Sequence, residues 1–547
     1  MADFGYNSIY PSRRSPVMGR RGAVATSHPL AAQAGIGMLA AGGNAMDAAL
    51  ATAAALTVLE PTSCGLGGDA FAIVWDEGKM YGLNASGKAP MSLSADRLRA
   101  AGMREVPKEG WASVTTPGVV SAWSALYDRF ASMPFCEIMA PAIEYAAEGA
   151  PVPPVVAGYW ADSEKRFGGR KGLYAEFERV FLPGGRAPRA GEIFRNPDLA
   201  ETLRSIAGSY GRSFYRGSLA RAIADYSQDT GGYISEEDLR EHAPQWVDPV
   251  SANYRGFDVW EIPPNGQGIV ALMALNIIEG YELESMDLMS PEVLHVVIEA
   301  LKLAFADAHG YIGDPLCVDI PTDELLSKGY ADRRRRLIRH DRALECPAPG
   351  NPGRAHGRWE GSDGDTVYLC TADCYGMMVS YIQSNYMGFG SGIVIPGTGI
   401  SMQNRGAGFS LEEGHSNELA PGRRPFHTII PSFITRDGIP IAAFGVMGGD
   451  MQPQGHVQLV SAIIDGKLDP QTAIDRPRVR VLGSQGVAAE PSIGENVADA
   501  LRRLGHEVRL ESEPAGFGGG QMIWRDPETG VLIAGSEPRK DGCAIAL

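Results

Sequence analysis

The residue with the clearest chemical potential is Thr366, which stands where the character of the sequence changes. Before it, the segment 341–365 is polar and rich in proline and glycine. After it, residues 367–372 alternate as in a strand, 373–376 form a turn signal, and 377–383 alternate again. The pattern therefore predicts a flexible loop that leads directly into a β-hairpin whose first residue is a threonine.

A threonine hydroxyl is a poor nucleophile unless a base lies beside it. When threonine is the first residue of a chain, its own α-amine, with a pKa near neutrality, can serve as that base. Thr366 is internal, so this chemistry requires cleavage of the Asp365–Thr366 bond. Taken alone, the position of Thr366 is also explained by the preference of threonine for strands, and spacing by itself carries no catalytic claim.

Seven ordered stretches strengthen the catalytic interpretation. They are GGNAMDAALATAAALTVLEPTSCGLGGDAF at 42–71, HVVIEALKLAFADAHGYIGDP at 295–315, GDTVYLCTAD at 364–373, FGSGIVIPGTGISMQNRG at 389–406, RRPFHTIIPSF at 423–433, FGVMGGDMQPQGH at 444–456 and SEPRKDG at 536–542. On these stretches the chain resembles the γ-glutamyltranspeptidase family of N-terminal-nucleophile hydrolases. The resemblance implies that Thr366 is the nucleophile.

The resemblance also implies an α+β fold, a four-layer αββα sandwich with two stacked sheets between helical layers. No internal repeat is evident, and no segment before 341 reads as a linker between independent domains. We therefore expect one intertwined domain made of two fragments, 1–365 with its flexible end 341–365, and 366–547. The two fragments would form a heterodimer.

Further catalytic residues follow from the same resemblance. Gly448 and Gly449 match the paired glycines whose N–H groups would stabilise an oxyanion. Ser384 matches a second hydroxyl residue that could hydrogen-bond the amine or hydroxyl of Thr366. A tight strand-to-helix turn would also need the glycines, and Ser384 could be an ordinary strand residue.

The positions expected to bind the substrate depart from the family pattern. Ser86, Gly408 and Arg405 replace an arginine, an aspartate and a glutamine, His427-Thr428 replaces a pair of serines, and Tyr386 replaces an asparagine. A γ-glutamyl head would lose the partners for its charges. Arg405 and His427 could instead accept a carboxylate, because arginine offers a bidentate fork. The pattern is closer to oxamate amidohydrolase or acylase-like relatives.

Three functions remain open at this point. The first is an autoprocessing amidase, a γ-glutamyltransferase or glutathione hydrolase by family, that acts on a small-molecule amide. The second is an amidohydrolase of a small acid amide such as oxamate. The third is a non-catalytic relative that keeps the fold for binding, although the Asp365–Thr366 junction and Gly448-Gly449 argue against it.

Composition excludes some classes of partner. The 547 residues carry a formal charge of −16, which disfavours nucleic acid and offers no basic face to an anionic membrane. The seven cysteines include no CxxC pair, so we expect neither a metal site nor a disulfide framework, and no cofactor. The first 16 residues lack the apolar core of a signal peptide, which favours a cytoplasmic location.

Some local features also yield expectations. Ser27 is predicted to cap a helix that begins near Pro29, and Asn44 to cap a helix that ends near Leu59. Residues 254–261 are expected to form one strand, and 333–336 a solvated basic helix face. The glycine-rich loop 62–69 precedes a strand and lacks GK[ST], so close backbone packing is expected there rather than phosphate binding.

Overall fold

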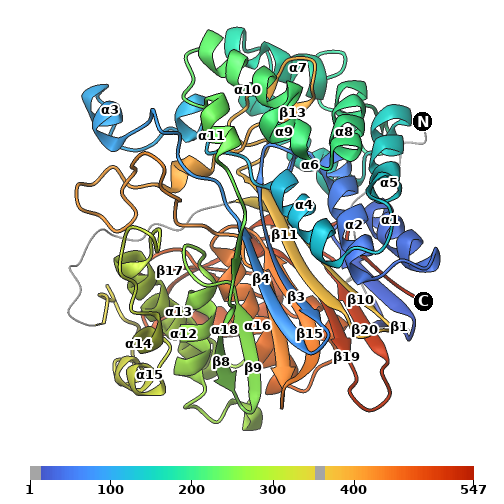
Figure 1. Ribbon diagram of the computed structural model, residues 1–547. Helices are drawn as coiled ribbons and strands as arrows, with labels where there is room; N and C mark the ends of the chain where they lie inside the picture. The colour runs from blue at the N-terminus through green and yellow to red at the C-terminus, as the bar shows by residue number, and fades with distance from the viewer. Residues whose placement is uncertain (1–13, 351–363) are drawn as a thin grey trace.

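Two seven-stranded sheets lie face to face in the computed structural model, which describes residues 14–350 and 364–547 (Figure 1). Sheet I has the order β21 (Cys543–Ala546), β2 (Gly22–Thr26), β10 (Asp365–Asp373), β11 (Met378–Tyr386), β3 (Asp69–Asp76), β4 (Lys79–Ala85), β7 (Gln245–Val247). Sheet II has the order β1 (Val17–Gly19), β20 (Leu532–Ser536), β19 (Gly519–Arg525), β15 (Ile439–Met447), β14 (Ser432–Arg436), β9 (Phe257–Glu261), β8 (Val250–Tyr254). Every pairing within these two sheets is antiparallel.

Helices cover the outer face of each sheet. Sheet I packs against α1 (Pro29–Ala40), α2 (Ala45–Leu59) and α4 (Val119–Phe130), and α5 (Phe135–Glu148) and α8 (Pro197–Ser209) extend this helical layer. Sheet II packs against α12 (Gly268–Ile278), α16 (Met451–Ile464) and α17 (Pro470–Asp475), and α13 (Pro291–Tyr311) and α18 (Glu495–Arg503) extend the layer on that side. The expected four-layer αββα sandwich is thereby confirmed.

Smaller elements extend the layers. At the top of Figure 1 lie α6 (Pro154–Phe167), α7 (Ala175–Phe181), α9 (Arg212–Arg216), α10 (Ser218–Asp229) and α11 (Glu236–Arg240), with α3 (Ala95–Ala100) at one side. Near α13 lie α14 (Thr322–Leu325) and α15 (Lys328–Arg335). A small sheet of β16 (Val479–Val481), β17 (Gly486–Ala489) and β18 (Glu507–Leu510) packs beside α13 and α18.

Strand β10 contributes to two different cores. Val367 and Leu369 join the cluster under the helices of sheet I, whereas Tyr368 and Cys370 lie between the two sheets. Successive side chains of a strand point to opposite faces, and here both faces are covered, so the whole strand is buried beyond its first residue. The sheets approach closely at this point: a Cβ on Gly445 of β15 would lie 2.5 Å from the Tyr368 ring.

Both sheets contain strands from both expected fragments. In sheet I, β2 precedes residue 366 in the sequence and pairs with β10 and β21, which belong to the later part. In sheet II, β14 pairs with β9 in the same way. The division into 1–365 and 366–547 remains a prediction, but any two such pieces share one core.

Two expectations about element ends need correction. The N-cap of α1 is His28, whose Nδ1 accepts from the Leu30 N–H, while the Ser27 hydroxyl donates to Glu60. Residues 254–261 do not form one strand: β8 ends at Tyr254, the chain turns at Arg255, which adopts φ 51°, and β9 begins at Phe257. The cap at Asn44 is confirmed and forms a capping box with Asp47.

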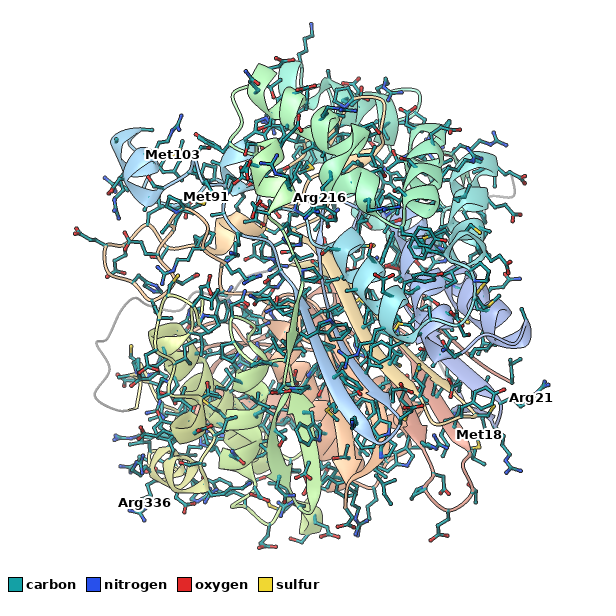
Figure 2. All side chains as sticks on the ribbon, viewed as in Figure 1. Met18, Arg21, Met91, Met103, Arg216 and Arg336 are labelled. Carbon is teal, nitrogen blue, oxygen red and sulfur yellow. The ribbon has the colours of Figure 1, made fainter. Side chains whose placement is uncertain are left out.

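The basic run 333–336 is only partly solvated. Arg336 is exposed, as Figure 2 shows, and so is Arg333. Arg334 is instead buried, with its Nε 3.1 Å from Asp307 and its Nη2 donating to the Ala348 carbonyl. The expected solvated face is therefore wrong for Arg334, because the Asp307 carboxylate of α13 compensates its charge.

The glycine-rich loop 62–69 packs tightly, as expected. A Cβ on Gly67 would collide with the backbone of Ser401, and one on Gly68 would lie 2.5 Å from the Ser384 carbonyl oxygen. The loop therefore runs against the end of β11, and only glycine allows this approach.

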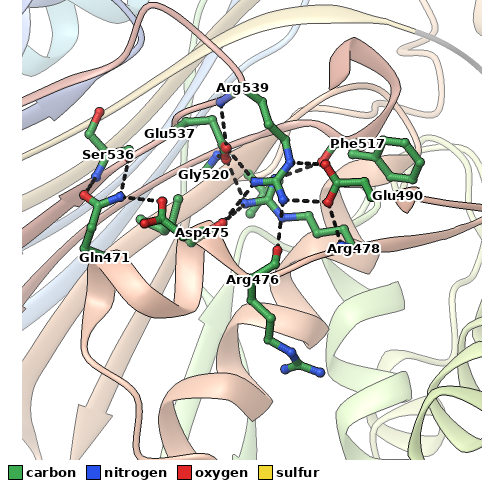
Figure 3. A network of polar contacts seen from close by, with 12 residues as sticks. Gln471, Asp475, Arg476, Arg478, Glu490, Phe517, Gly520, Ser536, Glu537 and Arg539 are labelled. Atoms are coloured by element: carbon green, nitrogen blue, oxygen red, sulfur yellow. Dashed lines mark hydrogen bonds and ion pairs between the residues drawn. The ribbon is translucent and has the colours of Figure 1, made fainter. Parts of the chain in front are cut away.

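A buried ionic network fixes the segment that follows β20. Glu537, which is not exposed to solvent, pairs with Arg478 at 2.7 Å and with Arg539 at 2.7 Å, and accepts from the Gly520 N–H (Figure 3). Arg539 also pairs with Glu490 at 2.6 Å. Burial by itself would raise the pKa of Glu537, but the two guanidinium groups hold it at about 2.

We predict that Glu537→Ala lowers the free energy of unfolding by about 3–5 kcal/mol, because it leaves the buried Arg478 guanidinium without a carboxylate and removes one of the two carboxylates that pair with Arg539. Chemical denaturation measures the difference. The control is Glu284→Ala, which removes an exposed ion pair with Lys467 and should change the free energy of unfolding little. The pKa of Glu537 is lower in the folded protein than in the unfolded chain. The contribution of ionised Glu537 to the free energy of unfolding is therefore complete above about pH 4.5 and is lost as the pH falls toward 2. Equal losses in the two variants would contradict this account.

Candidate active site

Thr366 lies at one end of the two sheets, as the second residue of β10, and is 3% exposed. The pairing of β10 with β11 shifts register between Asp365 and Val367. Such irregularities redirect a side chain out of the regular ladder. The Thr366 hydroxyl consequently reaches Ser384 of β11 and Gln452 of α16, and so lies between elements of both sheets.

Ser384 connects Thr366 with the bond that would be cut. The Thr366 hydroxyl donates to Ser384 Oγ at 3.2 Å, and Ser384 Oγ donates to the Asp365 carbonyl oxygen at 2.7 Å. Ser384 Oγ also accepts from the Tyr386 N–H at 2.8 Å. The Ser384 hydroxyl thus holds the Thr366 oxygen and also polarises the Asp365 carbonyl that the Thr366 oxygen would attack.

Gly448 and Gly449 form the turn from β15 into α16. Gly448 has φ 124° and Gly449 φ 56°, and both values lie in the region that favours glycine. Neither N–H donates to another residue within 14–350 or 364–547. The Gly449 carbonyl accepts from Gln267 Nε2 at 2.9 Å, which fixes the orientation of the turn.

A cavity of about 800 Å³ opens beside these residues. Asp365, Tyr386, Gly408, Thr428 and Gly448 line it, together with charged groups of both signs. The cavity therefore brings the scissile bond, one of the paired glycines and several of the expected binding positions to one surface.

Arg405 lies beneath the wall of the cavity. It is fully buried, donates from Nη1 to Thr428 Oγ1 at 2.6 Å, and stacks 4.0 Å from the Tyr386 ring centroid. Within the part of the chain that the structure describes, it forms no ion pair, and its Nε has no hydrogen-bond partner. Burial lowers the pKa of Arg405 to about 10, so the group still carries a positive charge at neutral pH.

His427 and Ser86 occupy different positions from those expected. His427 is fully buried: Nε2 lies 3.0 Å from Asp69 and Nδ1 accepts from the Ile429 N–H. Burial, reinforced by Arg405, holds the pKa of His427 well below its ordinary value. A neutral imidazole with both nitrogens engaged does not suit a carboxylate partner. Ser86 is likewise buried, with its hydroxyl on Asn84, away from the cavity.

Several residues at the site escaped sequence reasoning. Gln452 Nε2 lies 3.5 Å from Thr366 Oγ1, while its Oε1 accepts from the Ile430 N–H at 3.0 Å. The sequence feature that could have identified Gln452 is the family stretch 444–456, which contains it together with the paired glycines. Tyr159 lines the cavity from α6, but no local pattern in the sequence marks it.

One buried cluster has the residue types of a metal site. His295, Glu299 and His506 present ligand atoms within 4.8 Å of one another. The Lys302 ammonium already occupies this position, since it lies 2.8 Å from Glu299 and 3.3 Å from His506, and His295 and His506 bond each other at 2.7 Å. The arrangement fits an internal cation that balances a buried carboxylate and does not fit a metal ion.

Among the described helices, none is both long enough and apolar enough to cross a membrane.

The chain resembles known proteins over its whole length. The gamma-glutamyltranspeptidase family profile matches residues 31–547. The glutathione hydrolase-like proenzyme of Bacillus subtilis (strain 168) is 35% identical, over 97% of this chain and 99% of its own length. The oxamate amidohydrolase proenzyme of Klebsiella pneumoniae is also 35% identical, over 96% of this chain and 98% of its own. The crystal structure of a cephalosporin acylase from Bacillus halodurans matches with a TM-score of 0.95 and 50% identity, over 100% of this chain and 99% of that one.

We predict that Gly449→Ala lowers kcat by about 10²–10³, as expected when one oxyanion donor is displaced. With φ 56°, an alanine at this position costs only about 1–2 kcal/mol, so the protein should still fold. Steady-state kinetics and circular dichroism measure the two effects. The control is Gly438→Ala, at φ 74° in the exposed β14–β15 turn, which should carry similar strain without loss of turnover. An unchanged kcat in folded Gly449→Ala would remove this N–H from the mechanism.

Proposed function

The chain belongs to the gamma-glutamyltranspeptidase family, and from this premise we propose that Thr366 becomes its N-terminal nucleophile. It is an enzyme of that family, an autoprocessed amide hydrolase or acyltransferase. The observation that carries the assignment of Thr366 is its hydrogen-bond chain through Ser384 to the Asp365 carbonyl. Fragments 1–365 and 366–547 would then remain together through the shared sheets.

Self-cleavage follows from this chain of contacts. Thr366 Oγ1 bonds to the Asp365 carbonyl carbon, its proton passes to Ser384, and the Ser384 proton passes to the Asp365 oxygen. When the tetrahedral centre collapses, the proton on the Asp365 oxygen passes to the nitrogen, the carbonyl re-forms and the C–N bond breaks. The acyl group remains on Thr366 as an ester, and the nitrogen, which now carries two hydrogens, becomes the new α-amine. Water hydrolyses the ester and yields the Asp365 carboxylate and a free Thr366 hydroxyl.

The same hydroxyl then acts on substrate. The α-amine of Thr366 takes the hydroxyl proton as the oxygen attacks the substrate amide, and the amine gives that proton to the departing nitrogen. The N–H groups of Gly448 and Gly449 stabilise the oxyanion that forms. Water releases the acyl group in hydrolysis, and a second amine releases it in transfer.

We assign the substrate class from the charges at the cavity. The Arg405 guanidinium donates from Nη1 to Thr428 Oγ1 at 2.6 Å. A substrate carboxylate that accepts from the Thr428 hydroxyl would therefore also be stabilised by the positive charge of Arg405. Gly408 contributes no side chain that could pair with an α-ammonium. The proposed substrates are therefore amides of acids that carry a carboxylate and lack an α-ammonium.

The names of two relatives agree with this class. Oxamate, named for the Klebsiella protein, is a small acid amide without an ammonium group, and the Bacillus halodurans relative is named as an acylase. A cavity of about 800 Å³ exceeds the needs of oxamate and has the size of sites for drug-sized ligands. It favours amides with a sizeable amine portion. Glutathione hydrolysis, suggested by the name of the Bacillus subtilis relative, is the weaker candidate because its γ-glutamyl head carries the ammonium.

The first test is intact-mass measurement. Wild-type protein should separate into 1–365 and 366–547 under denaturing conditions, with Thr366 at the new N-terminus. Thr366→Ser keeps a hydroxyl and should still cleave, whereas Thr366→Ala should remain one chain. Cleavage at the same bond in Thr366→Ala would show that another group is the nucleophile.

The second test concerns specificity, with two substrates that differ only in the α-amine, glutaryl-p-nitroanilide and γ-glutamyl-p-nitroanilide. On processed enzyme, kcat/KM should be higher for the glutaryl compound. Arg405→Ala should raise the KM of the glutaryl compound with a smaller effect on kcat, because the positive charge behind the Thr428 hydroxyl, and with it part of the uniform binding of the carboxylate, is lost. The neutral pentanoyl-p-nitroanilide serves as control and should respond little. A preference for the γ-glutamyl compound would overturn the assigned class.

A further inference from the structure

Gln267 joins two parts of the cavity wall that come from different elements. Its Nε2 donates to the Thr428 carbonyl at 2.6 Å and to the Gly449 carbonyl at 2.9 Å. Thr428 carries the hydroxyl proposed to bind the substrate carboxylate, and Gly449 belongs to the oxyanion turn, the pair Gly448-Gly449. One amide group thus connects the carboxylate-binding residue with the oxyanion turn.

The side-chain amide of Gln267 is held in one orientation. The residue is fully buried, and both groups that face Nε2 are carbonyl oxygens, which accept hydrogen bonds and cannot donate them. The nitrogen must therefore point toward them, and its two hydrogens serve one carbonyl each. Oε1 is buried without a hydrogen-bond partner among the described residues. An unsatisfied buried acceptor costs stability, so packing alone does not explain a glutamine at this position.

The backbone of Gln267 is fixed against the segment that carries Thr428. Gln267 is the N-cap residue of α12, which packs beside α16 (Figure 1). Its N–H donates to the His427 carbonyl at 2.9 Å, and the His427 N–H donates to the Asn265 carbonyl at 2.9 Å. Residues 265–267 and 427–428 therefore lie side by side, and the Gln267 side chain reaches from this pairing to the start of α16.

The oxyanion turn needs such an anchor because two glycines form it. Glycine has few steric limits on its backbone, so the direction of the Gly449 N–H is not fixed by the chain itself. The Gly449 carbonyl accepts from Gln267 Nε2 and from the Gln452 N–H at 3.2 Å in the first turn of α16. Holding this carbonyl from two sides restricts rotation about the Gly449 backbone bonds, and it thereby fixes the direction of the N–H of the same residue.

We propose that Gln267 is a positioning residue for both binding and turnover: with one amide group it holds Thr428 and the oxyanion turn in fixed positions relative to each other. This inference rests on the proposed roles of Thr428 and Gly449. A substrate must contact both at once, with its carboxylate on Thr428 and its amide carbonyl at the Gly449 N–H. Oxyanion donors stabilise the transition state only when they are already in position, and small displacements lower the rate.

The test compares processed wild type with Gln267→Met, which keeps the length of the side chain and removes both donors. Self-cleavage should still occur, because Ser384 polarises the Asp365 carbonyl in that step. For pentanoyl-p-nitroanilide, which has no carboxylate, kcat should fall at least about tenfold with little change in KM, as part of the 10²–10³ that loss of an oxyanion donor costs. For glutaryl-p-nitroanilide, kcat should fall by a similar factor and KM should also rise, because Thr428 is displaced as well.

The matched control is Gln458→Met. Gln458 is also buried, and its Nε2 also donates to two backbone carbonyls, those of Gln454 at 3.1 Å and Val479 at 2.9 Å, away from the cavity. This variant loses hydrogen bonds of the same kind, so it should keep kcat and both KM values near those of wild type even if its unfolding midpoint falls. A purely structural defect in Gln267→Met would lower kcat for both substrates equally and leave both KM values unchanged.

The outcomes separate this inference from the proposed function. Cleavage of Thr366→Ala, or a preference of wild type for the γ-glutamyl compound, would reject the proposed function whatever Gln267 does. If wild type behaves as proposed, wild-type constants in Gln267→Met, or a lower kcat without a higher KM for the glutaryl compound, reject the role of Gln267 alone. If Gln267→Met fails to fold or to process, Gln267→Asn decides, since it keeps the amide but is one methylene too short to reach both carbonyls. The same changes in kcat and KM then support the role of Gln267, and wild-type constants overturn it.

Discussion

The position of β10 is the constraint on which the rest of this structure depends. The strand pairs with β2 on one side and β11 on the other, and its two faces fill two different cores. A strand in this position can form only when sequence on both sides of residue 366 folds together. Thr366 is therefore placed by an uncut chain. The bond before it can be cut without loss of the ladder, because the paired residues from Leu369 to Asp373 lie beyond it.

Two buried arginines illustrate opposite uses of charge in this fold. Arg478 is matched by Glu537 at 2.7 Å and serves the structure. Arg405 is buried to the same degree, yet only hydroxyl groups and the Tyr386 ring contact it among the interactions of the described residues. A buried cation without a carboxylate partner costs stability, and such sites are commonly functional. The positive charge of Arg405, which has no carboxylate partner among the described residues, is therefore the main electrostatic feature behind the Thr428 wall of the cavity.

The last part of the chain joins the sheets to the cavity. Strand β20 leads into the Glu537 network, then to Lys540, which hydrogen-bonds Tyr159 of the cavity, and then to Asp541 at the start of α6. β21 follows immediately and closes the edge of sheet I beside β2. Residues that are more than 150 positions from Thr366 thus fix the wall of the cavity at α6.

The sequence by itself determined the family, and with it the expected layers, and it singled out Thr366 as the proposed nucleophile. Alternation over 367–372 identified β10, the capping box at Asn44 marked the start of α2, and ordered family stretches singled out Thr366, Ser384 and the paired glycines. These features depend on local periodicity or on short contiguous patterns, which a linear reading can detect. Tertiary structure alone decided which side chains meet: it engaged His427 with Asp69, turned Ser27 toward Glu60, buried Arg334 on Asp307, and brought Gln452, Tyr159 and Lys540 to the site. The physical reason is that burial and charge compensation depend on partners distant in sequence, and neither periodicity nor propensity carries that information.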